Sequence, residues 1–97
     1  MKKRAAIELT DDERKTYLST ALTIILVTVG RDGYPHAVPM WFLVESDGSV
    51  YMTTYGRSQK VVNVRRNPRV ALLVESGVRY DELKGVLIRG DAEVVED

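Results

Sequence analysis

The sequence contains no cysteine, which excludes disulfide bonds, thiol nucleophiles and cysteine-ligated metal sites. It contains a single histidine, His36, and no acidic residues at a metal-binding spacing from it, so no metal site is predicted. A Ser/His/Asp arrangement, paired carboxylates on a shared face, a Walker loop and a GxGxxG loop are all missing as well. The sequence therefore nominates no catalytic acid, base or nucleophile.

Long hydrophobic runs are also missing. The longest, Ala21–Val29, is far shorter than the roughly 20 residues that a membrane-spanning helix needs. The first residues, MKKR, resemble the basic start of a signal peptide, but charged residues occupy positions 11–15, where the apolar part of such a peptide would lie. We therefore expect a cytoplasmic protein with neither an export signal nor a membrane partner.

The chain has no net charge, because fourteen Lys and Arg residues balance fourteen Asp and Glu residues. This neutrality disfavours nucleic-acid binding by the domain as a whole. Ninety-seven residues, 44% of them hydrophobic and 29% charged, are typical of one soluble globular domain. A core of this size is small, so pairing with a second subunit would stabilise it considerably.

The first half of the chain indicates a helix followed by strands. Thr10 and Glu13 have the spacing of a capping box, which predicts a helix from about Asp11 to Ser19. Leu22–Val29 is rich in β-branched residues and ends at a Gly-Arg-Asp-Gly turn, which predicts a strand buried on both faces. A second strand is predicted over Tyr34–Glu45.

Pro35 and Pro39 lie in that second strand. Because proline cannot donate a hydrogen bond, both need a sheet edge, a bulge or a strand end. Asp47-Gly48 favours a tight hairpin turn and leads into a third strand, Ser49–Thr54.

The second half of the chain indicates one inserted helix between strands. Ser58–Arg66 allows about two helical turns before Asn67-Pro68 ends them. Two further strands are predicted over Arg69–Glu75 and Gly85–Val95, joined by a connection at 76–84. Five strands linked mostly by hairpins predict an antiparallel sheet curled into a barrel.

The segment Thr53–Val70 gathers five cations and no acid: Arg57, Lys60, Arg65, Arg66 and Arg69. Ser58 occupies the N-cap position of the inserted helix, so backbone N–H groups, a hydroxyl and a lysine could converge on one anion such as a phosphate. The alternative is that Arg57 and Lys60 are solvated charges on a surface helix. The other three cations lie further from the cap, and we expect them at the surface or paired with carboxylates.

Several of these stretches occur together in one known family. DGYPHAVPMWF, GRSQK, NPRVALLV and GDAEVVED, in this order, resemble the pyridoxamine 5'-phosphate oxidase-like, FMN-binding split-barrel family, in its flavin- or deazaflavin-dependent reductase branch. The resemblance covers roughly residues 22–97. It implies a mainly β, antiparallel split β-barrel of six strands with an N-terminal helix and one short inserted helix. It also implies one domain over 1–97, without the further strand and helix with which relatives usually continue.

The resemblance further implies a homodimer with FMN or coenzyme F-420, a deazaflavin, bound at the interface. The phosphate contacts of the family fall on Ser58, Gln59 and Lys60, with Arg57 beside them. The strand along the flavin ring corresponds to His36, Ala37, Val38, Pro39, Met40 and Trp41, and the next strand contributes Met52, Thr53 and Thr54. Lys84 and Gly85 lie near the place where some relatives supply a glutamine from the other subunit, and no glutamine is present here.

Two aromatic residues follow each other in the ring-facing strand. We expect Trp41 and Phe42 in the core rather than stacked on a ligand, and adjacent strand residues face opposite sides, so at most one could contact the ring. His36 is expected to be a strand residue beside the cofactor.

The function implied by the resemblance is that of a flavin- or deazaflavin-dependent oxidoreductase, which transfers a hydride between the cofactor and a small molecule. In such enzymes the cofactor carries the reaction and the protein supplies binding, orientation and electrostatics. A non-catalytic flavin- or haem-binding protein on the same fold is an alternative. A nucleic-acid module that uses the basic segment is another, which the neutral composition disfavours. Between FMN and coenzyme F-420 the sequence leaves the choice open.

Overall fold

A computed structural model describes residues 9–96 of the chain. These residues form, in chain order, α2 (Asp11–Thr20), β1 (Thr23–Val29), β2 (Pro35–Trp41), β3 (Leu43–Val44), β4 (Val50–Tyr51), α3 (Gln59–Arg66), β5 (Arg69–Ser76), a 3₁₀ helix η1 (Tyr80–Glu82) and β6 (Lys84–Asp91). The predicted mainly β, antiparallel class with one N-terminal and one inserted helix is confirmed. Neither α-helix in this part of the chain is long and apolar enough to cross a membrane.

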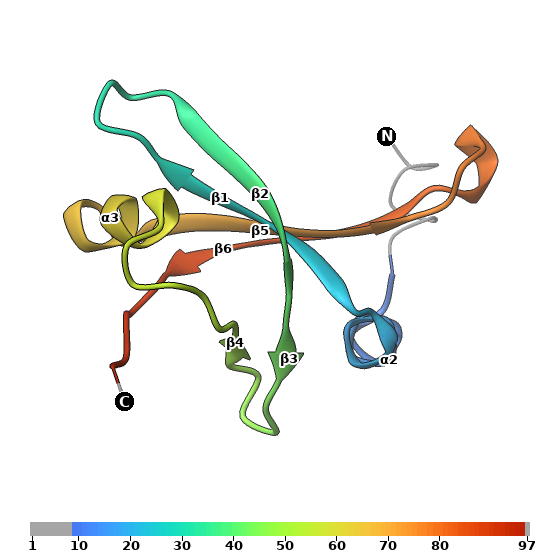
Figure 1. The fold of residues 1–97 in the computed structure, drawn as a ribbon. Coiled ribbons are helices and arrows are strands. Elements are labelled where there is room, and N and C mark those ends of the chain that lie inside the picture. Colours follow the sequence, from blue (N-terminus) through green and yellow to red (C-terminus); the bar gives the residue numbers. More distant parts are fainter. Residues whose placement is uncertain (1–8, 97) are drawn as a thin grey trace.

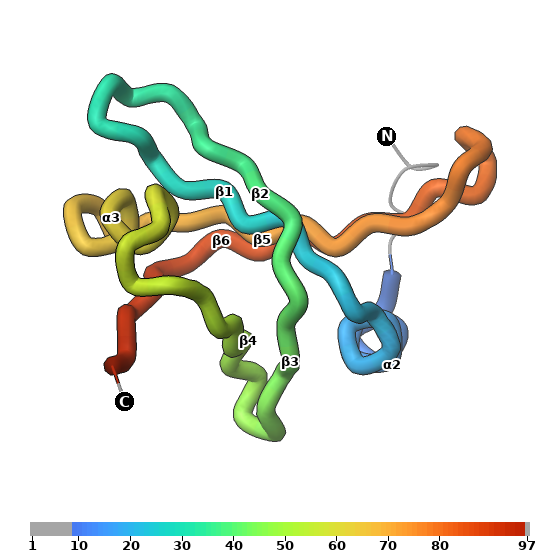
Figure 2. The backbone as a smooth tube through the Cα atoms, viewed as in Figure 1, coloured from blue at the N-terminus to red at the C-terminus, as the bar shows by residue number. Residues whose placement is uncertain are grey.

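Four of the strands form an antiparallel sheet in the order β2-β1-β5-β6, and β3 and β4 form a separate two-stranded hairpin. Figure 1 shows α3 at one end of the sheet and the β5–β6 hairpin projecting at the opposite end. The chain trace in Figure 2 turns away from β2 into β3, and β4 then leads back toward α3. β2 and β6 are thus the edge strands of the larger sheet.

One face of this sheet carries the core. Ile24 and Leu26 of β1 and Leu72 and Val74 of β5 are buried there, because alternate residues of neighbouring strands share a face. The partly buried residues that pack against them come mostly from α2 and from the β2–β4 segment: Tyr17, Leu18, Ala21, Val38, Met40, Phe42, Val50 and Met52. These contacts make this face the interior of the barrel.

The opposite side of the same sheet we call the open face. Its apolar residues are Ile25, Val27 and Val29 of β1, Pro35, Ala37, Pro39 and Trp41 of β2, Ala71 and Leu73 of β5, and Leu87 of β6. None of them is buried within residues 9–96, and Trp41 and Leu87 are 82% and 64% exposed. The prediction that the first strand is buried on both faces is therefore wrong for this chain alone, since an apolar sequence does not specify what covers each side.

The two prolines of β2 lie on a sheet edge, which is one of the three positions predicted for them. Pro39 pairs with Ile25 and Pro35 with Val29 in an uninterrupted register. Because proline has no N–H to give to β1, the odd-numbered residues of β2 must direct their backbone groups away from β1. The free edge of β2 therefore presents the carbonyls of residues 35, 37, 39 and 41, but N–H groups from Ala37 and Trp41 alone.

Several strands are shorter than predicted. The strand expected over 34–45 divides at Phe42 into β2 and β3, the one expected over 49–54 pairs only at Val50–Tyr51, and the last ends at Asp91 rather than Val95. Sequence propensity is local, whereas a strand also needs a partner along its whole length.

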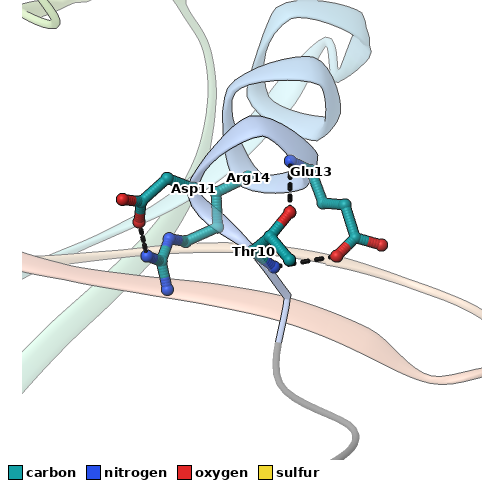
Figure 3. Close-up of polar contacts among 4 residues, drawn as sticks. All are labelled: Thr10, Asp11, Glu13 and Arg14. Atoms are coloured by element: carbon teal, nitrogen blue, oxygen red, sulfur yellow. Dashed lines mark hydrogen bonds and ion pairs between the residues drawn. The ribbon is translucent and has the colours of Figure 1, made fainter.

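The capping box predicted at the start of α2 is present (Figure 3). The Glu13 N–H donates to Thr10 Oγ1 at 3.1 Å, and the Thr10 N–H donates to Glu13 Oε1 at 2.8 Å. Arg14 pairs with Asp11 on the same turn. Two N–H groups that the helix cannot satisfy itself are bonded in this way.

Replacing Thr10 with alanine is expected to lower the free energy of unfolding by about 1 kcal/mol, because the helix loses its N-cap acceptor. Urea unfolding followed by circular dichroism measures this loss. Thr16→Ala is the matched control, since Thr16 lies within α2, where alanine is the better helix former. An equal loss in both variants would contradict the role of the cap.

The same box makes stability depend on pH. Hydrogen bonds from the Thr10 backbone and side chain hold the pKa of Glu13 below its ordinary value of 4.5. Its carboxylate therefore stabilises the fold above that value, and this contribution is lost as the pH falls through the lower folded pKa. We expect Glu13→Gln to show a smaller drop in urea midpoint between neutral and acidic pH than the unaltered chain. Identical drops would remove Glu13 as a source of acid sensitivity.

Candidate functional site

The N-terminus of α3 has unsatisfied hydrogen-bonding groups. Ser58 is its N-cap, as predicted, with extended backbone angles, but its side chain makes no capping bond. The Val62 N–H is the first to bond within the helix, to the Ser58 carbonyl at 3.2 Å, so the N–H groups of residues 59–61 have no intrahelical partner. The Ser58 Oγ is buried and has no hydrogen-bond partner among the described residues. The turn therefore offers an anion several donors.

Two of the five cations in this region lie next to that turn. Lys60 is half-buried and Arg57 is exposed, and neither forms an ion pair with residues 9–96. Partial burial beside free N–H groups favours an anion at Lys60 more than at a fully solvated lysine.

The remaining cations have other roles. Arg65 pairs with the carboxylate of Glu96, as expected for a cation remote from the cap. Arg66 is exposed, in agreement with the surface alternative, and it donates to the Val29 carbonyl at 2.6 Å and to Asn63 Oδ1 at 3.1 Å. These hydrogen bonds connect α3 to the end of β1.

Asn63 is the centre of this connection, and the sequence patterns did not single it out. It is fully buried, as is Thr28, and Asn63 Nδ2 donates to Thr28 Oγ1 at 3.0 Å. Asn63 Oδ1 also accepts from Gln59 Nε2 at 2.8 Å. Gln59 therefore directs its amide toward Asn63, so its predicted contact with a phosphate would have to come from its backbone N–H. A polar residue on the apolar side of a helix, beside Val61 and Val64, was the available signal.

The six residues predicted along the flavin ring do not share a side of β2. The alternation of the strand places His36, Val38 and Met40 toward the interior and leaves Ala37, Pro39 and Trp41 on the open face. The prediction that Trp41 lies in the core is wrong, while Phe42 does pack against it. A ligand that contacts residues from both sets must lie along the free edge of the strand.

An open surface pocket of about 450 Å³ lies between the β1–β2 turn and α3. It is lined by residues 30–32 and 34–36 of the turn and by Gln59 and Asn63 of the helix. His36 and Gln59, two residues predicted to bind the cofactor, meet here. His36 Nδ1 is buried and, like Ser58 Oγ, has no hydrogen-bond partner among residues 9–96. Buried polar atoms are rarely left unbonded, so both atoms fit a site that takes a polar ligand.

Met52, Thr53, Thr54, Lys84 and Gly85, which were also predicted to bind the cofactor, do not line this pocket. Met52 packs against the core, and Thr53 and Thr54 are exposed. Lys84 and Gly85 pair with Ser76 and Glu75, which lie seven and six residues along β5 from Arg69. These separations are roughly 23 Å and 20 Å at about 3.3 Å per residue. Since α3 lies at the Arg69 end, Lys84 and Gly85 are not brought together with Ser58 and Lys60 within one chain.

Comparison with known proteins gives concordant matches. The family model of pyridoxamine 5'-phosphate oxidase matches residues 10–97. A 5a,11a-dehydrotetracycline/5a,11a-dehydrooxytetracycline reductase of Streptomyces rimosus is 36% identical over an alignment of 85 residues, with coverage of 82% of this chain and 60% of that protein. A conserved hypothetical protein of Mycobacterium tuberculosis has a crystal structure with a TM-score of 0.88 at 44% identity, covering 97% of this chain and 58% of that one.

A structure of an F420 reductase gives a TM-score of 0.68 at 30% identity, covering 82% of this chain and 61% of that chain. In each of these three relatives, this chain spans about three-fifths of the length. The family model spans the sheet, the β3–β4 hairpin and α3 together. The chain belongs to the pyridoxamine 5'-phosphate oxidase family and has its split-barrel fold.

Proposed function

We propose that this chain is a flavin- or deazaflavin-dependent oxidoreductase that transfers a hydride between its cofactor and a small unsaturated molecule. The observation that carries the proposal is the turn at Ser58–Lys60, where three backbone N–H groups lack an intrahelical partner and, within residues 9–96, the Ser58 hydroxyl has no hydrogen bond and Lys60 no ion pair. FMN and coenzyme F-420 both carry a phosphate that such donors bind. The bound cofactor supplies the hydride chemistry.

The side chains of the site bind and orient in this proposal. Ser58, Lys60 and the N–H groups of residues 59–61 hold the phosphate, and Arg57 adds charge for the anionic tail of the deazaflavin. The free edge of β2 and Met52, Thr53 and Thr54 border the ring. No side chain is assigned as an acid or base.

The names of two relatives support an oxidoreductase. One is a reductase of dehydrotetracyclines and the other an F420 reductase. FMN and coenzyme F-420 remain the two candidates, and their shared phosphate is what the turn at α3 recognises.

We also propose that the open face binds a second copy of this chain, with the cofactor at the interface. The face is apolar in its centre, and Arg69, Glu75, Arg89 and Asp91 border it. Because both charge signs are present, a twofold-related copy can pair each with its opposite. A second subunit would also bring its own Lys84 and Gly85 to a site that the first subunit cannot reach with them.

Cofactor titration tests the proposed function. We expect FMN or coenzyme F-420 to bind the purified protein, and quenching of cofactor fluorescence measures this binding. We also expect a conjugated acceptor to oxidise the reduced cofactor on the protein under anaerobic conditions. Binding without turnover of any acceptor would favour the non-catalytic flavin- or haem-binding alternative. Absence of binding for both cofactors would overturn the proposal.

A further inference from the structure

The inner side of α3 contacts β1 through two kinds of interaction. Val61 and Val64 are buried against the sheet, and Asn63 and Arg66 make directed hydrogen bonds to Thr28 and the Val29 carbonyl. Apolar packing holds the helix on the sheet but is non-directional, so it leaves rotation and sliding of the helix weakly specified. Hydrogen bonds require particular distances and angles. Two anchor points on consecutive β1 residues therefore define the axis and rotation of α3.

The buried pair is costly to keep. Thr28 and Asn63 are both 0% exposed, and desolvating an amide and a hydroxyl opposes folding unless they are well bonded. Valine and leucine could fill similar volumes without that cost. The pair therefore suggests a requirement for position rather than for stability.

We propose that Asn63 is a positioning residue that orients the anion-binding turn of α3 relative to β2. This inference rests on the proposed function, because it assumes a phosphate at Ser58–Lys60. Asn63 acts through Gln59, the first residue of the helix, whose amide it fixes at 2.8 Å, and through Thr28, whose cross-strand neighbour is His36. One buried side chain thus links the donors of the turn to the strand that borders the ring.

Phosphate discrimination is the quantity that this role predicts. We define it as the dissociation constant of the phosphate-free chromophore divided by that of the phosphate-bearing cofactor. The two ligand pairs are riboflavin with FMN, and the phosphate-free deazaflavin with coenzyme F-420. A misoriented turn weakens only the phosphate contacts, so the phosphate-free constant stays unchanged. Loss of general folding would instead weaken both ligands together.

The experiment compares Thr28→Val, Asn63→Leu and the double variant with the unaltered chain, using whichever ligand pair the unaltered chain binds. We expect each variant to lose about tenfold in phosphate discrimination, with an unchanged constant for the phosphate-free ligand. The double variant is expected to melt at the same temperature or higher, because it replaces both buried partners by apolar groups. Thr28→Ser keeps the hydroxyl and is expected to keep the discrimination.

The outcomes separate the two proposals. Unchanged discrimination in Thr28→Val and in the double variant, together with a loss in Lys60→Ala, would overturn the role of Asn63 and leave the anion site standing. If either Thr28→Val or the double variant fails to fold, the phosphate discrimination of the one that folds still decides the role of Asn63. Absence of discrimination in the unaltered chain would overturn the anion site and this inference together.

Discussion

Replacing Lys60 with alanine is expected to weaken binding of the phosphate-bearing cofactor about ten- to a hundredfold. Lys60 is half-buried, lies in the first turn of α3 and makes no ion pair within residues 9–96, so its charge is available to an anion. A charge-assisted hydrogen bond contributes about 1.5 to 3 kcal/mol, which corresponds to that range of affinity. Titration with FMN and coenzyme F-420, monitored by fluorescence, measures it.

Arg65→Ala is the matched control for Lys60→Ala. It also removes one cation from α3, but Arg65 lies in the last turn and pairs with Glu96. We expect its cofactor affinity to match that of the unaltered chain. Riboflavin, which lacks the phosphate, should bind the Lys60 variant normally. Equal FMN affinities for the Lys60 variant and the unaltered chain would rule out the phosphate assignment.

The variant Leu73→Glu is expected to be monomeric and to bind the cofactor poorly. Leu73 lies near the centre of the open face, paired with Ile25 on one side and Leu87 on the other. A carboxylate buried there without a partner would cost several kcal/mol in the dimer, whereas in the monomer it faces water. Sedimentation velocity reports the association state, and the same titrations report the affinity.

Leu22→Glu serves as the control for this surface. Leu22 is 77% exposed, immediately precedes β1 and lies outside the open face, so the same substitution should leave both the dimer and the affinity intact. A Leu73 variant that remains dimeric would reject the open face as the interface. A monomeric variant with undiminished affinity would instead place the whole cofactor site within one chain.

The fold class and the element order follow from local rules that the sequence states directly. A capping box begins α2, Gly and Asp residues turn the hairpins, and Asn67-Pro68 ends α3, because each depends on backbone geometry within a few residues. The position of Ser58 as an N-cap is of the same kind. The prolines of β2, which lack a donor, limited them to an edge, a bulge or a strand end, and the structure places β2 at an edge.

The candidate site could be predicted only in part. The resemblance placed Ser58–Lys60 and His36–Trp41 in it, and the structure locates the first group at a helix start with free donors. The resemblance did not indicate which of the residues His36–Trp41 face the interior. Strand alternation divides these six residues into an inward-facing and an outward-facing set, and a register shift by one residue would exchange the two sets.

By itself, then, the sequence determined the order of the elements and the helix start at Ser58, since these depend on neighbours in the chain, and its motifs indicated the family by resemblance. Tertiary structure alone decided that Trp41 faces outward, that β1 is covered on one side, that Arg66 binds a backbone carbonyl and that Asn63 reaches Thr28. The hydrogen bonds of Asn63 to Thr28 and of Arg66 to Val29 join residues 35 or more positions apart. Their geometry is set by which strands pair and which face each helix covers, and no local pattern contains that information.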